Sequence, residues 1–220
     1  MSPKSKTKYS PKSHNSPQRY PLISALEQGA EAFLPQLLVE QKTKAYTLVL
    51  DLDETLVHCA NPNTQDQPII NVRPGALDFI KTMSELYEVV IFTAGTKEYA
   101  DLALKSADPN GLVSHRLYRE HAIQRGSVFV KDISKLGRDL RKTIIIDNVV
   151  ENFQLQPENG IFVNSWTDDA EDDTLIKLVP ILKQIVKQKI SDVRIALRHY
   201  RDSQMRTLLN KGKASVNSYY

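Results

Sequence analysis

The residues best suited to chemistry are Asp51 and Asp53, which lie directly after the apolar run 47–50. That run is rich in strand-forming residues and long enough for a buried strand. Carboxylates that follow a central strand of an α/β sheet lie where such sheets bind ligands. Two neighbouring negative charges repel each other, and a cation usually compensates them. On this stretch alone two interpretations remain open: solvated acids, with Asp53 capping a helix, or a magnesium site with an acid nucleophile.

Three further motifs follow in order along the chain. They are Ile-Phe-Thr-Ala-Gly-Thr at 91–96, Phe-Val-Lys-Asp at 129–132 and Ile-Ile-Ile-Asp-Asn at 144–148. With Asp-x-Asp-Glu-Thr at 51–55, they resemble the haloacid dehalogenase superfamily of phosphatases. Within it, they resemble the small phosphatases that act on the RNA polymerase II C-terminal domain. The resemblance runs from about residue 46 to about residue 200, and four ordered motifs are far more specific than one.

The resemblance implies roles for four side chains. Asp51 would attack phosphorus and become an aspartyl phosphate. Asp53 would protonate the leaving oxygen and later take a proton from water. Lys131 would lie against the nucleophile and offset the negative charge that builds up during transfer. Thr93 would donate its hydroxyl to the phosphate.

The resemblance also implies Mg²⁺ as the cofactor. A carboxylate and a phosphate about 4 Å apart repel each other by roughly 4 kcal/mol per pair of unit charges, at an effective dielectric constant of about 20. Mg²⁺ supplies positive charge and takes oxygen ligands in octahedral geometry. By resemblance its ligands come from the Asp51 side chain, the Asp53 backbone carbonyl and the pair Asp147 and Asn148. The match favours Asn148 as the direct ligand, with Asp147 as a partner of the metal shell or of Lys131.

Four other residues are candidates for substrate binding. The amides of Ala94 and Gly95 could form an anion-binding turn. Arg119 matches an arginine near the phosphate side of these enzymes, although an arginine in a surface hairpin is ordinary. Thr55 would hold the first loop in shape or contact the phosphate, and both roles stay open.

Several other polar residues have simpler explanations. Cys59 does not indicate a cysteine-dependent phosphatase, because the position that should hold its arginine is Gln65. His58 is expected to be a structural hydrogen-bonding residue. The acids within 168–173 precede an apolar helical run, so caps and favourable helix-dipole contacts explain them better than a metal cluster.

The expected elements alternate between strands and helices. Buried strands are predicted at 47–50, 88–92, 143–146 and 161–163, with a short strand at 69–72. Helices are predicted at 22–38, where Pro35 interrupts the pattern, after the turn 73–75, at 97–106, and near 172–188 and 191–202. The helix after 73–75 has as its apolar face Leu77, Phe79, Ile80, Met83 and Leu86. Residues 114–130 predict a hairpin or small antiparallel insert. The fold class is α/β: a Rossmann-like parallel sheet flanked by helices, with a small β insert and no large cap domain.

The composition fits one domain with tails. The chain has 220 residues, a net charge of +3 and one cysteine. Such a charge is too small to predict nucleic-acid binding, and one cysteine excludes an internal disulfide and fits a reducing compartment. We expect no membrane span and no secretory signal, and a soluble protein of the nucleus or cytoplasm. We expect a disordered basic tail at 1–20, a phosphatase domain at 21–205 with its catalytic core at 44–200, and a C-terminal tail at 206–220.

The expected function is a Mg²⁺-dependent phosphoserine/phosphothreonine protein phosphatase with a phosphorylated protein as partner. Two alternatives stay open: a catalytically silent binding protein of the same fold, and a phosphatase of small or nucleic-acid phosphate esters. An open site without a cap favours a macromolecular substrate. Only fourteen residues, 59–72, separate His58 from Arg73. In the resembled family this connection is longer and holds an apolar pocket for a proline, so specificity for polymerase repeats is open.

Overall fold

The computed structural model describes residues 32–36, 44–61 and 67–216, with side chains up to residue 206. The chain divides into two compact units, 1–31 and 32–220. The first unit lies outside the described residues, and so do the predicted basic tail and most of the helix predicted at 22–38. All of the described residues belong to the second unit.

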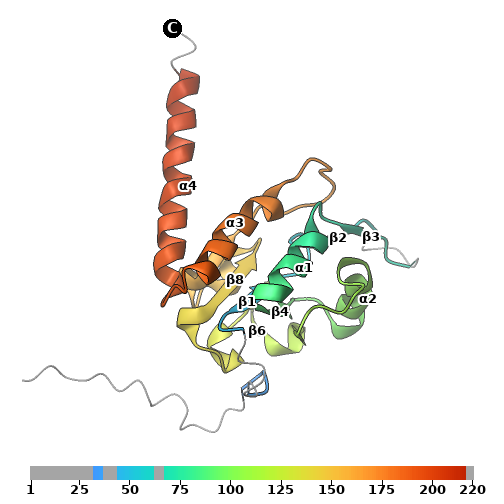
Figure 1. Cartoon of the computed structure of the whole chain (residues 1–220). Coiled ribbons are helices and arrows are strands. Elements are labelled where there is room, and N and C mark those ends of the chain that lie inside the picture. Colours follow the sequence, from blue (N-terminus) through green and yellow to red (C-terminus); the bar gives the residue numbers. More distant parts are fainter. Residues whose placement is uncertain (1–31, 37–43, 62–66, 217–220) are drawn as a thin grey trace, which may run out of the picture. The chain divides into compact units, whose positions relative to one another are not determined.

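A five-stranded parallel sheet forms the centre of this unit (Figure 1). Its strands are β1 (Thr47–Leu50), β4 (Glu88–Phe92), β5 (His115–Leu117), β8 (Thr143–Asp147) and β9 (Gly160–Phe162), in the order β5-β4-β1-β8-β9. Every residue of β1, β4 and β8 is buried, as expected for parallel strands covered on both faces. In register, Leu50 of β1 pairs with Ile91 of β4 and Ile146 of β8, so these three strands end at one edge.

In the described part of this unit, four helices and several short turns pack around the sheet. The helices are α1 (Ala76–Leu86), α2 (Lys97–Ala107), α3 (Thr174–Lys187) and α4 (Val193–Val216). Leu48 and Leu50 pack with residues of all four helices in one apolar cluster. Val49 points the opposite way, into a second cluster with Leu34 and Phe153. No helix in the described part of the chain has the length and apolar character needed to cross a membrane.

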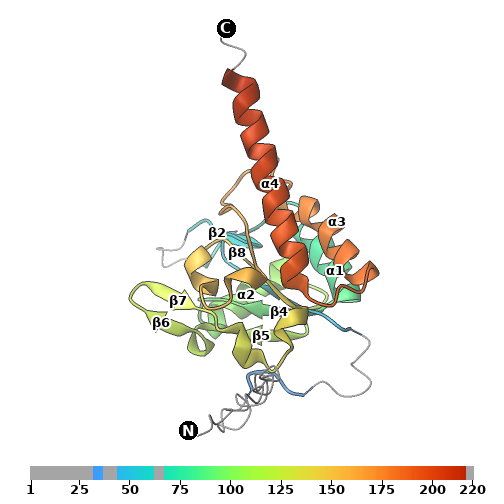
Figure 2. The same ribbon diagram turned by 90° about the vertical axis from the view of Figure 1, so that its left-hand side faces the viewer.

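Two antiparallel hairpins complete the unit (Figure 2). One pairs β2 (Val57–Cys59) with β3 (Ile70–Val72), and the other pairs β6 (Ile123–Arg125) with β7 (Val128–Val130). The other short elements among the described residues are 3-10 turns: Arg119–His121, Ile133–Leu136, Leu140–Lys142, Val150–Phe153 and Pro157–Asn159. Over residues 44–61 and 67–216 there is no inserted domain, so the predicted α/β fold with a small β insert is confirmed.

Several details differ from the predictions. Residues 32–36 are not helical: Phe33 donates its amide to the carbonyl of Lys135 at 2.8 Å, and Pro35 disfavours a helix around it. His115–Leu117 joins the parallel sheet at its edge instead of the antiparallel insert. Leu77 is 46 % exposed, because the buried stripe of α1 runs through Ala76, Phe79, Ile80 and Met83. Helix α4 also continues past residue 206 to Val216.

Candidate active site

The predicted polar residues meet where three central strands end. Asp51 follows β1, Thr93 follows β4, and Asp147 is the last residue of β8. Asp51 is only 4 % exposed and donates its amide to the carbonyl of Ile146 at 2.9 Å. The strand register alone therefore brings these side chains together, as the carboxyl edge of a parallel sheet requires.

The loop after β1 is held by a buried arginine that the sequence did not point to. Arg73 donates to the carbonyl of Thr55 at 3.2 Å and forms two 2.8 Å bonds to the Asp172 carboxylate. Asp172 also accepts from the amide of Thr174 at 3.1 Å, whereas Asp173, the N-cap residue of α3, makes no side-chain cap bond. Hydrogen bonding to Arg73 lowers the pKa of Asp172. Glu54 in this loop has φ 59°, a left-handed conformation that the surrounding contacts stabilise.

Lys131 is fully buried and lies between two carboxylates. Its Nζ atom is 2.5 Å from Asp51 Oδ1 and 2.6 Å from Asp147 Oδ2. Burial acts to lower the pKa of Lys131, but the two carboxylates outweigh it and the pKa is raised. The ammonium therefore stays charged and is shared by two acids.

Asp147 and Asn148 have different surroundings. Both oxygens of Asp147 have partners: Oδ2 accepts from Lys131, and Oδ1 accepts from the Val149 amide at 2.8 Å and from Asn152 Nδ2 at 3.1 Å. Burial, reinforced by Asp51, raises the pKa of Asp147 to about 6. Asn148 instead donates through Nδ2 to Ser165 Oγ at 2.9 Å, which leaves its Oδ1 directed toward Thr55.

The Thr55 hydroxyl brings two acceptor oxygens together. It lies 3.0 Å from Asp51 Oδ2 and 3.4 Å from Asn148 Oδ1. A hydroxyl has one hydrogen, so it satisfies only one of these acceptors at a time. Carboxylate and amide oxygens side by side are the ligands that Mg²⁺ takes in proteins, so these residues fit the predicted ion. Within the described ranges no three His, Cys, Asp or Glu side chains form a metal cluster. The predicted direct ligands are of other kinds, because they include the side-chain amide oxygen of Asn148 and the backbone carbonyl of Asp53.

Asp53 is half-buried and is hydrogen-bonded at both carboxyl oxygens. The Tyr99 hydroxyl donates to Oδ1, and the Thr93 hydroxyl lies 3.3 Å from Oδ2. Burial raises the pKa of Asp53 against the effect of these two bonds, and Asp51 adds to the rise. A carboxyl group with a raised pKa suits proton donation.

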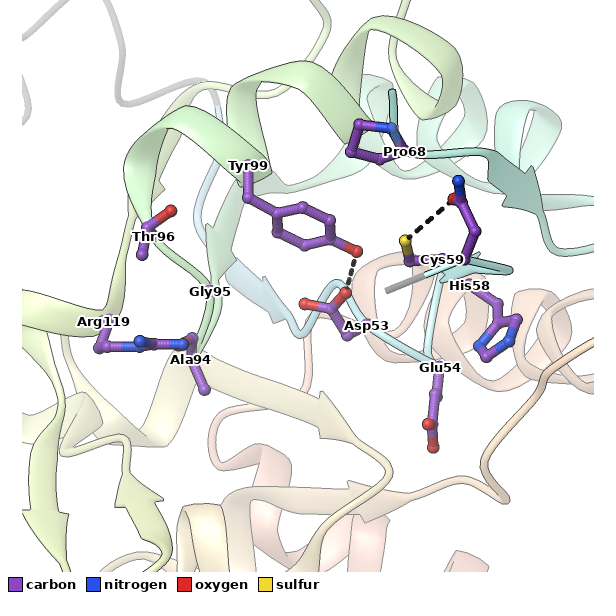
Figure 3. A pocket seen from close by; sticks show the side chains of 11 residues that line it. Asp53, Glu54, His58, Cys59, Pro68, Ala94, Gly95, Thr96, Tyr99 and Arg119 are labelled. Carbon is purple, nitrogen blue, oxygen red and sulfur yellow. Dashed lines mark hydrogen bonds between the residues drawn. The ribbon is translucent and has the colours of Figure 1, made fainter. Parts of the chain in front are cut away.

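A cavity of about 500 Å³ opens above Asp53 (Figure 3). It is lined by Asp53, Glu54, His58, Cys59, Asn61, Pro68, Ala94, Gly95, Thr96, Tyr99 and Arg119. Of the predicted substrate-binding residues, Ala94, Gly95 and Arg119 line it, and Thr93 lies behind its wall, where it accepts from the Gly95 amide at 2.9 Å. Arg119 donates to the Ala94 carbonyl at 2.6 Å. His58 and Cys59, which have simpler explanations in the sequence, also face this cavity.

Tyr99 is a second residue of the site that the sequence does not indicate. It lies in the first turn of α2, after the 91–96 motif, and nothing in its spacing distinguishes it from an ordinary helix residue. Only the approach of α2 to the loop after β1 shows that its hydroxyl meets Asp53.

The parallel sheet, with acids at its carboxyl edge, is the arrangement expected from the resemblance to phosphatases of the haloacid dehalogenase superfamily. The chain belongs to the NLI interacting factor-like phosphatase family, whose model matches residues 46–194.

The chain is similar to two curated proteins and one solved structure. A probable C-terminal domain small phosphatase of Dictyostelium discoideum is 37% identical over 191 residues, which cover 80% of this chain and 62% of the relative. Mitochondrial import inner membrane translocase subunit TIM50 of Kluyveromyces lactis is 38% identical over 172 residues, which cover 78% of this chain and 35% of that protein. The solved structure of Fcp1, an essential RNA polymerase II CTD phosphatase, aligns with a TM-score of 0.49 at 21% identity. The alignment covers 74% of this chain and 54% of the Fcp1 chain. The chain thus spans less than two thirds of each.

Proposed function

We propose that this chain is a Mg²⁺-dependent phosphoserine/phosphothreonine protein phosphatase that works through an aspartyl phosphate on Asp51. The observation that carries the proposal is the pairing of the buried Asp51 with Lys131, next to Asp53 at the floor of an open cavity. An acid nucleophile beside a carboxyl group of raised pKa matches the demands of this two-step chemistry.

The first step transfers the phosphoryl group to Asp51. A carboxylate oxygen of Asp51 attacks phosphorus, the bond from phosphorus to the serine or threonine oxygen breaks, and Asp53 gives that oxygen a proton. In the second step Asp53 accepts a proton from water, which attacks the aspartyl phosphate and releases inorganic phosphate. Asp51 and Asp53 are then restored to their starting states.

Positive charge near Asp51 allows the phosphate to approach. Lys131 offsets part of the charge from its buried position. Asp51, the Asp53 carbonyl and Asn148 would hold Mg²⁺, which supplies further positive charge to the phosphoryl oxygens. Asp147 has both oxygens occupied by protein donors, which supports a role as the partner of Lys131.

The remaining phosphate contacts would come from the cavity wall and from Thr93 directly behind it. Thr93 would donate its hydroxyl, Ala94 and Gly95 their amides, and Arg119 its guanidinium, while Thr55 shapes the loop. Arg119 stacks on the Phe129 ring at 5.2 Å, which holds its exposed side chain near the opening. An open cavity of this kind accommodates a phosphorylated segment of a protein better than it encloses a small metabolite.

One rival function has specific support. The similarity to TIM50, a subunit of a translocase, supports a binding protein that keeps the fold without turnover. Turnover is favoured instead by two groups of contacts at this edge of the sheet: Lys131 binds both Asp51 and Asp147, and Thr93 binds Asp53.

The deciding experiment measures phosphate release from phosphoserine peptides and from 4-nitrophenyl phosphate, with Mg²⁺ and with EDTA. Turnover that depends on Mg²⁺ is expected. Equal rates in EDTA would contradict the role of the metal. No turnover of any phosphate ester, together with tight binding of a phosphopeptide, would favour the binding protein.

A further inference from the structure

Tyr99 contacts Asp53 directly, and the chemistry above gives it no task. Its half-buried side chain belongs to the first turn of α2, and its hydroxyl donates to Asp53 Oδ1 (Figure 3). Thr93, from the end of β4, lies 3.3 Å from Asp53 Oδ2. The two oxygens of one carboxyl group are therefore held by donors from two different elements.

The Tyr99 ring lies next to Gly95, in the space that a larger residue there would need. A Cβ atom at Gly95 would lie 3.0 Å from Tyr99 Cδ1 and 3.2 Å from Thr93 Oγ1, which is tighter than ordinary contact. Gly95 is thus needed here for space. A side chain at this position would push the ring or the Thr93 hydroxyl away from Asp53, so glycine here allows both donors to reach the carboxyl group.

We propose that Tyr99 is a positioning residue that assigns the transferred proton to Oδ2 of Asp53. This inference rests on the proposed function. A hydrogen bond from Tyr99 makes Oδ1 the acceptor, so the proton of the acid form is carried by Oδ2. Oδ2 faces Thr93, whose hydroxyl is proposed to bind the phosphate, so the proton is directed to the side where the leaving oxygen lies.

Thr93 cannot hold Asp53 during the reaction if it also binds the phosphate. Its hydroxyl has a single hydrogen, which serves either the Asp53 carboxylate or a phosphoryl oxygen. Once that hydrogen turns to the phosphate, the Tyr99 hydroxyl remains as the donor to Asp53. Tyr99 therefore matters most in the complex with substrate.

The step that depends on this geometry is the breaking of the bond from phosphorus to the substrate oxygen. The electron pair of that bond stays on the leaving oxygen, which takes the proton from Asp53 Oδ2, while a new bond joins Asp51 to phosphorus. A serine oxygen is strongly basic and needs this proton as it leaves. A 4-nitrophenol oxygen leaves readily without it, so only the serine reaction needs an accurately placed acid.

Tyr99→Phe keeps the ring and removes the hydroxyl, and its effect should depend on the leaving group. With enzyme in excess, we expect the first-turnover rate on a phosphoserine peptide to fall by about 10- to 100-fold, the range that a misplaced catalytic group produces. The rate of 4-nitrophenol release from 4-nitrophenyl phosphate in the first turnover should fall by less than about threefold. KM for the peptide should change little, because Tyr99 acts on Asp53 and not on the phosphate.

Tyr118→Phe is the matched control. The Tyr118 hydroxyl also binds a carboxylate, because it donates to Asp101 Oδ1 at 3.0 Å. Asp101 belongs to α2, the helix that carries Tyr99, and Tyr118 does not line the cavity. We expect it to leave the ratio of the two first-turnover rates unchanged. That ratio is measured on one sample, so it does not depend on the fraction of enzyme that is folded.

A double variant separates positioning from other effects. In an Asp53→Asn background, which has no proton to deliver, adding Tyr99→Phe should change the serine rate by less than about twofold. Equal slowing of both substrates by Tyr99→Phe, or no slowing of either, would overturn the inference while the proposed function stands. A wild-type enzyme that turns over neither substrate would instead overturn the proposed function.

Discussion

The central sheet has one edge where its strands begin and one where they end, and each of these buries a carboxylate against a basic side chain. Only the edge at the carboxyl ends of the strands has the properties of a site. At the amino end of β4, Glu88 forms two 2.7 Å bonds with Arg138 and accepts from Thr47 at 2.9 Å. At the carboxyl end of β1, Asp51 lies 2.5 Å from Lys131 and 3.0 Å from Thr55. The contacts are alike in distance and in burial.

The difference lies in how the charges are matched. Arg138 serves one carboxylate, and although burial acts to raise the pKa of Glu88, the bonds to Arg138 outweigh it and lower the pKa. Lys131 is shared between Asp51 and Asp147, Asp53 lies close by, and the pKa values of Asp53 and Asp147 are both raised. A buried ion pair is therefore a structural feature when it is balanced, and it indicates a site when acids outnumber bases beside a cavity.

The sharpest test of this contrast replaces the acid at each edge. Asp51→Asn should lower kcat by at least about a thousandfold, because an amide cannot serve as the nucleophile. Its circular dichroism spectrum should match the wild type. Glu88→Gln should retain kcat per folded molecule, measured on 4-nitrophenyl phosphate. Near-normal activity of Asp51→Asn would show that Asp51 is not the nucleophile.

Removal of the base at the structural edge should affect stability alone. Arg138→Met leaves Glu88 buried without its arginine, with only the Thr47 hydroxyl and His115 beside it. We therefore expect the free energy of unfolding to fall by about 3 kcal/mol, measured by urea denaturation. Arg141→Met is the control, because Arg141 pairs with Asp139 on the surface, where its side chain is 64% exposed. No measurable change is expected there. A loss of kcat in folded Arg138→Met would show that the two edges are coupled.

The two edges should also respond to pH with opposite slopes. Asp147, whose pKa is raised to about 6, contributes stability in its protonated form, and this is lost as the pH rises from about 4 to about 6. Glu88, whose pKa is lowered, contributes stability above the ordinary carboxyl range, and this is lost as the pH falls through it.

The measurement is the free energy of unfolding in EDTA across about pH 3.5 to 7, for wild type, Asp147→Asn and Glu88→Gln. The advantage of wild type over Asp147→Asn should shrink as the pH rises. Its advantage over Glu88→Gln should shrink as the pH falls. If the advantage of wild type in the free energy of unfolding changed with pH in the same direction for both variants, the distinction between the two edges would be lost.

The smallest expected effect concerns the rim of the cavity. Arg119→Ala should lower kcat/KM on all phosphopeptides by a similar factor, because Arg119 is proposed to contact the phosphate that they share. Peptides with and without a proline after the phosphoserine should differ by less than about tenfold, since small apolar contacts contribute only modest discrimination. Matched peptide pairs measure both quantities. A strong Ser-Pro preference would show that the cavity contains a proline pocket.

The fold and the polar edge of the sheet were predictable because they depend on local pattern. Apolar runs that end in Asp51, Thr93 and Asp147 mark strands that are buried on both faces, and parallel strands bring their ends together. The sequence does not place His115–Leu117 in the parallel sheet, because this edge strand is only partly buried and has polar residues at two of its three positions.

The parts that were not predictable depend on contacts between distant segments. Arg73 reaches Asp172 across 99 positions of the chain, and Tyr99 reaches Asp53 across 46. Neither residue has a spacing that indicates its partner. Leu77 shows the same limit on a smaller scale, because only the packed helix decides which side of an apolar stripe faces the core.

The most direct test of the central claim is to locate the phosphoryl group on the enzyme during turnover. Samples quenched in acid while a phosphorus-32-labelled phosphoserine peptide is consumed should carry label on Asp51, and the label should be released by hydroxylamine, as an acyl phosphate is. Asp51→Asn should carry none. Label on His58 or Cys59, which face the same cavity, or phosphate release without any labelled enzyme, would contradict the account.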